Sequence, residues 1–362
     1  MPASAPAALR VLDAADAAGR AAWLAAWQAW PAREVFAHPG YVALYATDGA
    51  RPLCALLATP AGTVLYPFLL RPLSDGLGEP GHDLTTPYGY GGPVAWGAAD
   101  VPALAAAFWP AFDAWCAREG IVSEFVRFLL GPADRLPFPG AVEERALNVV
   151  RSLDLPADAL WMDAEHKVRK NVRRAQASGV TVETDETGAR LDAFLSVYHA
   201  TMDRREAGAS YYFPASYFEA LHRDLPGQFV YAFAMLDGVA VSAELVLVSE
   251  TAVYSFLGGT DSAAFGARPN DLLKVEIARW AQNRGKRRFV LGGGYEPGDG
   301  IYRYKTSFAP NGSVPFHVGT RVHDAARYDA LCERCRALAR ASGAVWAPAP
   351  AFFPAYRAPA VR

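Results

Sequence analysis

The pattern of apolar and polar positions predicts alternating helices and strands in the first half of the chain. Three tryptophans at helical spacing in an alanine-rich stretch predict a helix over residues 16–30. Apolar runs on either side of a Pro-Ala-Gly turn predict a β-hairpin over residues 53–70. The elements that follow are a glycine-bearing segment over 84–94, a helix over 99–118 and a strand over 123–130.

The second half repeats this order. Asp237-Gly238 is a strong hairpin signal between two apolar runs, because both turn positions favour residues that tolerate a positive φ. A third strand runs into Gly258-Gly259, and Asn270 is placed to cap the next helix, which Gly285 ends. The predicted ranges are 229–236, 239–249 and 252–257 for strands, 270–284 for the helix and 288–291 for the last strand. An internal duplication is the economical explanation.

A basic segment lies between the halves. Residues 165–174 contain five lysines and arginines, with Val168 and Val172 one helical turn apart, which predicts a one-sidedly cationic helix. Such a face is either solvated or binds a phosphate-bearing or polyanionic substrate.

Length and composition set broad limits. The 362 residues favour two domains, which we expect at 1–155 and 156–345, followed by a tail at 346–362. The composition, 52% hydrophobic and 20% charged, is typical of a folded protein, and no apolar run reaches the roughly 18–20 residues that span a bilayer. Without a signal-peptide pattern at the start, a cytoplasmic location without stable membrane insertion is expected.

Charge and cysteine content exclude several classes of function. A net charge of −2 argues against a protein that coats DNA or RNA nonspecifically. Four scattered cysteines do not form a disulfide framework, and Cys332 and Cys335 fall in a predicted helix over 325–341 without a second ligand pair. The histidines show no metal-binding spacing, so neither a metal nor another cofactor is predicted.

The chemically most suggestive segment follows the last strand. Gly292-Gly293-Gly294 leaves a strand end with little side-chain bulk, where a ligand can approach closely. In residues 301–308, two cations alternate with two tyrosines, which indicates an extended segment with charge on one face and rings on the other.

Several motifs, in this order, resemble those of a known family. They are Arg173-Arg174-Ala175 in the basic helix, Thr201-Met202-Asp203-Arg204, the Tyr254 strand ending in Gly258-Gly259, Leu272-Leu273-Lys274-Val275-Glu276, and Tyr304-Lys305 after the glycines. Together they are similar to the FemABX peptidyltransferases and to the BioF2-like branch of the acetyltransferase (GNAT) superfamily, over roughly residues 33–322. Residues 83–93 resemble the second branch in particular.

The resemblance implies an α/β fold of two tandem GNAT-like domains, each with a mixed, mainly antiparallel sheet. It also implies transfer of an amino acid from aminoacyl-tRNA to an amine of a peptidoglycan precursor, without a metal or a covalent intermediate. The long helical arm that some members carry is missing here.

The resemblance also suggests site residues. Lys305 would stabilise the tetrahedral intermediate or hold the donor's terminal phosphate, and Tyr254 would orient a carbonyl. The predicted donor-binding residues are Gly258, Gly259, Arg268, Asn270, Gly293 and Arg303, and the predicted acceptor-binding residues are Arg204, Arg205, Tyr88 and Tyr90. Glu244, Glu296 and Asp299 are candidate general bases, although substrate-assisted proton transfer needs none.

The donor follows from a missing motif. Enzymes of the GNAT type bind the coenzyme A pyrophosphate with a Gln/Arg-x-x-Gly-x-Gly/Ala motif at a strand-to-helix loop. Residues 260–270 form the corresponding loop here and lack this motif, and Pro269 removes one backbone hydrogen-bond donor. We therefore expect an aminoacyl-tRNA donor, with an amine-bearing cell-wall precursor or specialised metabolite as acceptor. Two alternatives stay open: an acyl-CoA-dependent N-acyltransferase of polysaccharide or lipid assembly, and a noncatalytic GNAT-like module that binds an anionic precursor.

Overall fold

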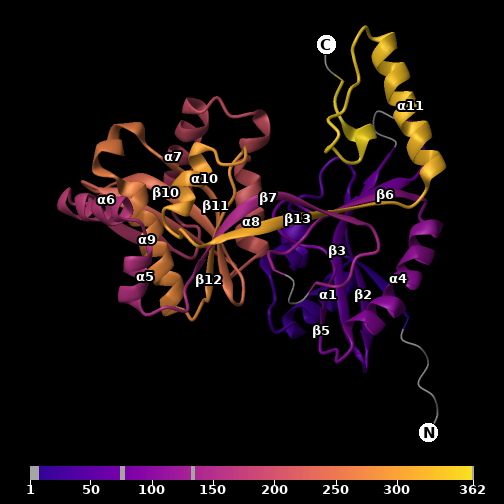
Figure 1. The fold of residues 1–362 in the computed structure, drawn as a ribbon, viewed down its shortest axis with the longest axis horizontal. Helices are drawn as coiled ribbons and strands as arrows, with labels where there is room; N and C mark the ends of the chain where they lie inside the picture. The colour runs from indigo at the N-terminus through magenta and orange to yellow at the C-terminus, as the bar shows by residue number, and fades with distance from the viewer. Residues whose placement is uncertain (1–7, 74–77, 132–134, 361–362) are drawn as a thin grey trace. The chain divides into compact units, whose positions relative to one another are not determined.

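The computed structural model describes residues 8–73, 78–131 and 135–360, and the chain folds into two compact units (Figure 1). The N-terminal unit comprises residues 1–31, 36–145 and 316–362, and the C-terminal unit comprises residues 32–35 and 146–315. No helix in these described ranges is long and apolar enough to cross a membrane.

The N-terminal unit is built on a mixed sheet. Its elements are β1 (Arg10–Asp13), α1 (Ala17–Ala29), η1 (Val35–Ala37), α2 (Pro39–Ala43), β2 (Arg51–Thr59), β3 (Gly62–Pro72), β4 (His82–Thr85), β5 (Val94–Trp96), α4 (Val101–Arg118), β6 (Ile121–Arg127), α11 (Ala325–Ala341) and η4 (Ala355–Arg357). The strands follow the order β1-β2-β3-β4-β6, β5 pairs with β3, and β13 (Ser313–Val322) pairs with β6. Strand β3 is antiparallel to both β2 and β4, whereas β4 and β6 are parallel and are joined through α4.

Aromatic side chains fill the core between α4 and this sheet. Asp100 caps α4 by accepting a hydrogen bond from the Ala103 amide at 2.9 Å. Phe112 of α4 packs against Tyr66 and Phe68 of β3, and Leu70 lies in the same cluster. Because side chains alternate along a strand, the residues between these on β3 face the opposite side of the sheet.

The C-terminal unit repeats the plan. Its elements are β7 (Ala141–Ser152), α5 (Ala157–Asp163), α6 (His166–Ala177), β8 (Thr181–Asp185), α7 (Leu191–Arg204), η2 (Ala209–Tyr211), α8 (Ala215–Asp224), β9 (Phe229–Leu236), β10 (Val239–Val248), β11 (Ala252–Thr260), η3 (Ser262–Ala267), α9 (Pro269–Asn283), β12 (Arg288–Gly292) and α10 (Gly300–Thr306). The strand order is β7-β12-β11-β10-β9-β8.

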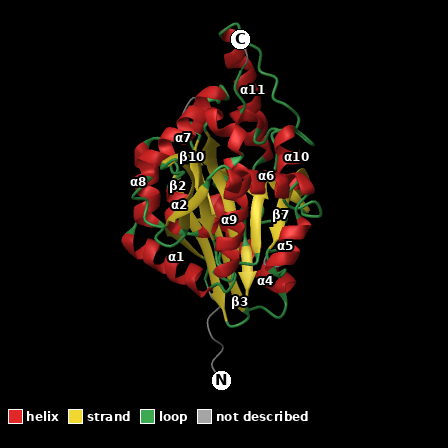
Figure 2. Cartoon of the chain, turned by 90° about the vertical axis from the view of Figure 1, so that its left-hand side faces the viewer, coloured by secondary structure: helices red, strands yellow, loops and turns green. Residues whose placement is uncertain are grey.

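Strand alternation separates two helical layers in this unit. Val230 and Ala232 of β9 share a core with α6 and α9, which lie side by side over the strands in Figure 2. Tyr231 and Phe233 face the other way, and Tyr231 contacts Phe194 of α7 with ring centroids 5.0 Å apart. The sheet is therefore covered by helices on both faces.

The predicted repeat is confirmed in three dimensions. Each unit has an antiparallel hairpin, a third antiparallel strand, a helix, and a strand that returns parallel to the third. The Asp237-Gly238 turn has φ values of 51° and 78°, as the sequence signal requires. The helices predicted over 16–30, 99–118, 165–174, 270–284 and 325–341 correspond to α1, α4, α6, α9 and α11.

The units differ from the predicted domain boundaries. Residues 316–345, which we assigned to the second domain, belong to the N-terminal unit. The reason is long-range pairing: β13 is antiparallel to β6, with Val318 opposite Arg127, and α11 packs Leu331 against Val122 and Leu73. A domain boundary predicted from local composition does not take account of a strand that pairs with the first sheet from far along the chain.

Candidate active site

The C-terminal unit contains a groove of about 560 Å³, which we call the lysine groove. It is formed by the end of β11, the first turns of α9, helix α10 and the end of α7. Its lining includes Glu244, Ser255, Lys274, Tyr304 and Lys305.

Glycines let α7 and β10 approach the strand that forms the groove floor. A Cβ on Gly259 would collide with Thr201 of α7 and would lie 2.7 Å from the carbonyl oxygen of Val197. A Cβ on Gly258 would lie 2.9 Å from the Ala243 carbonyl oxygen on β10. Both predicted donor residues line the groove, but helix and strand packing is what requires them to be glycine.

A buried ion pair lies at the groove. Glu244 and Lys274 are only 2% and 8% exposed, and their Oε2 and Nζ atoms are 2.5 Å apart. Lys274 also donates a hydrogen bond to Ser255 Oγ at 2.7 Å. Among the described residues, the second carboxylate oxygen of Glu244, Oε1, has no hydrogen-bond partner, although it is buried. An unused acceptor beside a groove is a position to which a bound ligand can donate a hydrogen bond.

Lys305 is electrostatically unusual. Its Nζ donates a hydrogen bond to the Gly293 carbonyl oxygen at 2.6 Å. Burial is the main cause that lowers the pKa of Lys305 to about 8, the Lys274 cation lowers it further, and Glu244 and Asp299 oppose the shift. Lys305 is therefore mostly cationic at neutral pH and loses its proton as the pH rises through about 8.

The segment that carries Lys305 is a helix, so the expected extended conformation is wrong. Asp299 caps α10 by accepting hydrogen bonds from the Tyr302 amide at 2.7 Å and the Tyr295 amide at 2.8 Å. The glycines serve this cap, because a Cβ on Gly294 would lie 2.7 Å from the Asp299 carboxyl carbon and closer still to its oxygen.

The helical register decides which side chains face the groove. Ile301, Tyr304 and Lys305, at i, i+3 and i+4, share one face of α10 and line it. Arg303 lies on another face, where its Nη1 donates to the Gly298 carbonyl oxygen at 2.6 Å. The predicted pairing of Arg303 with Lys305 on one charged face is thus wrong.

Four other predicted residues line the lysine groove: Arg204, Arg205, Arg268 and Asn270. Arg204 Nη1 donates to the Thr260 carbonyl oxygen at 2.9 Å, which holds the guanidinium at the end of β11. Asn270 does not cap α9, which begins at Pro269; instead its Nδ2 donates to Tyr304 Oη at 2.9 Å and links α9 to α10. Arg268, a predicted donor-binding cation, thus shares one groove with the predicted acceptor-binding Arg204 and Arg205.

The remaining predicted residues lie elsewhere. Tyr254 does not line the groove, because its hydroxyl donates to Glu34 Oε2 at 2.7 Å in a buried contact. Gly293 contributes only its carbonyl oxygen to Lys305. Tyr88 and Tyr90 belong to the N-terminal unit, where Tyr88 is 57% exposed and Tyr90 packs on Phe36 with ring centroids 5.3 Å apart.

Sequence reasoning missed Lys274 and Asp271 as site residues. Lys274 stands within an apolar helical run, and a cation in such a position must find a buried partner, which is a usable signal. Asp271 lies in the first turn of α9 and accepts a hydrogen bond from Asn171 Nδ2 of α6 at 3.0 Å. Burial raises the pKa of Asp271, and the bond from Asn171 opposes this.

Known proteins share this fold. Residues 163–306 match the family model described as an acetyltransferase (GNAT) domain. The structure of FemX superposes with a TM-score of 0.65 at 13% identity, over 86% of this chain and 98% of FemX. A conserved protein of Bacteroides thetaiotaomicron superposes with a TM-score of 0.55 at 11% identity, over 87% of this chain and 99% of that chain. A tandem GNAT protein from the clavulanic acid biosynthesis pathway has a TM-score of 0.47 at 11% identity, covering 87% of this chain and 98% of that one. No curated protein matches the sequence.

The family match confirms a GNAT domain in the C-terminal unit, and the FemX superposition confirms the expected α/β architecture. The family match spans α6 to α10 and therefore includes every element that forms the lysine groove. It also confirms the predicted class of enzyme, an acyltransferase.

Proposed function

We propose that this protein, a GNAT-type acyltransferase with the fold of FemX, forms an amide bond by direct aminolysis of an activated acyl or aminoacyl group in the lysine groove. The observation that carries the proposal is the cationic Lys305 beside a buried carboxylate with an unused oxygen, Glu244 Oε1. The Lys305 cation can stabilise a developing oxyanion, and the Glu244 carboxylate can accept the proton that the attacking amine loses.

The chemical step needs only these groups. The neutral amine attacks the donor's carbonyl carbon, a C–N bond forms, and negative charge develops on the carbonyl oxygen near the Lys305 ammonium. The amine's proton passes to Glu244, the bond from carbonyl carbon to leaving group breaks, and the leaving oxygen or sulfur receives the proton. Asp299 is unsuited to be the base because it caps α10, and backbone hydrogen bonds lower its pKa.

The start of α9 favours aminoacyl-tRNA over coenzyme A as donor. A pyrophosphate cradle uses free amide groups at a helix N-terminus. Here Pro269 lacks an amide hydrogen, and Asp271 places a carboxyl group in the first turn. Both features weaken binding of a dianionic pyrophosphate at this end of the groove.

Helix α6 offers a surface for the tRNA. It buries Val168, Val172 and Ala175 and exposes Lys167, Lys170, Arg173 and Arg174. The Asn171–Asp271 hydrogen bond joins this helix to the α9 turn that lines the groove. A donor whose aminoacyl end enters the groove can thus place backbone phosphates along α6.

The acceptor is an amine attached to an anionic body. Arg204 and Arg205 line the groove, and guanidinium groups bind phosphate and carboxylate oxygens bidentately. A peptidoglycan precursor or a charged specialised metabolite has both features. The acetyltransferase family match favours one alternative, an acyl-CoA donor for the same aminolysis.

A direct assay tests the proposal. The protein is incubated with tRNA charged with labelled amino acids, or with acetyl-CoA, together with amine-bearing cell-wall precursors, and amide formation is measured. We expect turnover with charged tRNA that Lys305→Met abolishes. The matched control is Arg303→Met, two residues away on a different face of α10, which leaves turnover largely intact. Turnover that survives Lys305→Met, or ligand binding without turnover of either donor, contradicts the proposal.

A further inference from the structure

The N-terminal unit contains a second groove, of about 790 Å³, which we call the arginine groove. Its walls carry four arginines from separate elements: Arg71 of β3, Arg127 of β6, Arg357 of η4, and Arg145 in the first residues of β7, which belong to the N-terminal unit. It lies on the sheet face opposite α4, because the alternate residues of β3 and β6 pack against that helix.

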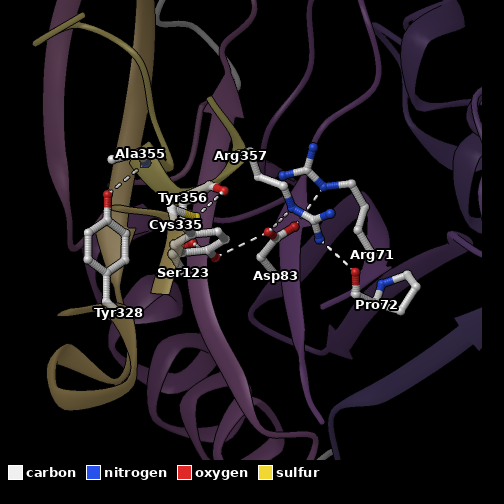
Figure 3. Close-up of polar contacts among 9 residues, drawn as sticks. All are labelled: Arg71, Pro72, Asp83, Ser123, Tyr328, Cys335, Ala355, Tyr356 and Arg357. Carbon is white, nitrogen blue, oxygen red and sulfur yellow. Dashed lines mark hydrogen bonds and ion pairs between the residues drawn. The ribbon is translucent and has the colours of Figure 1, made fainter. Parts of the chain in front are cut away.

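A buried carboxylate holds two of these arginines in place (Figure 3). Asp83 is fully buried; its Oδ1 accepts a hydrogen bond from Arg71 Nε at 2.7 Å, and its Oδ2 accepts one from Arg357 Nε at 2.9 Å. Tyr356 Oη donates to the same carboxylate at 3.1 Å. The two guanidiniums are therefore preorganised at the groove wall.

The C-terminal segment is bound firmly enough to serve as part of that wall. Figure 3 shows Arg357 reaching the Pro72 carbonyl oxygen, at 2.7 Å, while the Ala355 amide donates to Tyr328 Oη at 2.9 Å. On its buried side, Tyr356 Oη lies 2.6 Å from Ser123 Oγ. The preceding residues of the segment, including Phe352, line the groove with apolar surface.

The other two arginines, Arg127 and Arg145, form no ion pair with any carboxylate that the structure describes. The Arg127 guanidinium lies over the Phe125 ring, 5.0 Å from its centroid, and burial lowers the pKa of Arg127. Keeping a desolvated cation without a counter-charge is costly, which indicates that an anionic ligand supplies the charge.

We propose that the arginine groove binds the phosphate group of a phosphomonoester whose alcohol part is aromatic or apolar. Four guanidiniums line the groove, Asp48 is the carboxylate in its described lining, and the buried Asp83 pairs with two of the arginines from behind the wall, so two positive charges remain for a dianion. A phosphomonoester carries nearly that charge at neutral pH, and its oxygens suit bidentate arginines. Tyr88 and Phe352, 57% and 43% exposed, offer rings to the alcohol part.

A binding measurement, which does not require transfer activity, tests this site. Isothermal titration of the whole protein with 1-naphthyl phosphate, inorganic phosphate and 1-naphthol separates the anionic from the apolar contribution. We expect 1-naphthyl phosphate to bind most tightly, inorganic phosphate more weakly and 1-naphthol hardly at all. Losing one charged hydrogen-bond donor in Arg127→Gln should weaken naphthyl phosphate binding about tenfold or more. Arg118→Gln, an exposed arginine of α4 outside the groove, should leave it unchanged.

Folding does not confound the result. Arg127→Gln removes a buried cation that has no ion-pair partner in the described part of the chain, so we expect its melting temperature to match or exceed that of the wild type. If it fails to fold, Arg145→Gln, at a half-buried position, is compared in its place. The proposal is overturned if the wild type binds no naphthyl phosphate at millimolar concentration, if the folded variants bind it as well as the wild type, or if 1-naphthol binds equally. Loss of acyl transfer in other experiments would leave these outcomes unaffected.

Discussion

Replacing Lys305 by methionine should stabilise the folded protein at neutral pH while abolishing transfer. The pKa of Lys305 is about 8 in the folded protein, against about 10.4 for an unperturbed lysine. The unfolded chain therefore binds more protons between these values, and the stability of the wild type rises as the pH increases through that window. Below pH 8 the whole cost of burying the cation is present.

The magnitude follows from the shift. At 1.36 kcal/mol per pKa unit, a shift of this size corresponds to about 3 kcal/mol, which solvent screening around a partly buried side chain reduces to about 2 kcal/mol. Loss of the hydrogen bond to Gly293 destabilises the variant by about 1 kcal/mol and offsets part of this gain. Lys305→Met should therefore raise the free energy of unfolding by about 1 kcal/mol at pH 7 and lower it by a similar amount near pH 10.

Urea denaturation at pH 7 and pH 10 measures this, with Arg303→Met as the control on the same helix. The pH dependence of kcat provides an independent test. If the Lys305 cation stabilises the oxyanion, kcat falls above about pH 8, and Lys305→Arg, which keeps its proton, loses that falling limb. A Lys305→Met protein that is less stable than the wild type by the same amount at both pH values refutes the electrostatic reasoning. A falling limb that persists in Lys305→Arg refutes the catalytic role.

Three further changes test other parts of the site. Glu244→Gln leaves the buried Lys274 cation unpaired and should cost about 3–5 kcal/mol in urea denaturation, most of which the added change Lys274→Met restores; equal costs for the single and double variants would contradict the pairing. Gly294→Ala pushes a methyl group into Asp299 and should lower stability by about 1–3 kcal/mol and reduce kcat, since the α10 cap shifts; an unchanged melting temperature would show that this contact is not tight. Lys170→Glu on α6 should raise the KM for charged tRNA several-fold at low salt, with the effect fading as salt is added, while acyl-CoA turnover stays constant; a salt-independent change would argue against phosphate contacts.

The sequence by itself determined the elements whose signals are local. The β9–β10 hairpin follows from Asp237-Gly238, whose turn positions require positive φ, and α6 follows from valines one turn apart in a basic segment. The order of these elements in each half was enough to expect a duplication, and the resemblance of the motifs implied two GNAT-like units. The same resemblance pointed to Lys305, Arg204 and Asn270 as site residues.

Tertiary structure alone decided which groups meet. Lys274 and Glu244 come from α9 and β10, and their contact depends on how that helix lies over the sheet. Helix α10 is too short to be stable from its own hydrogen bonds, so its conformation depends on the Asp299 cap and on packing, which the alternation of Tyr302-Arg303-Tyr304-Lys305 does not encode. Asp83 and Arg357 meet because β13 carries the chain back to the first sheet before the C-terminal segment begins. Periodicity reports a residue's neighbours along one element, whereas charge pairing and burial arise between elements far apart in the chain.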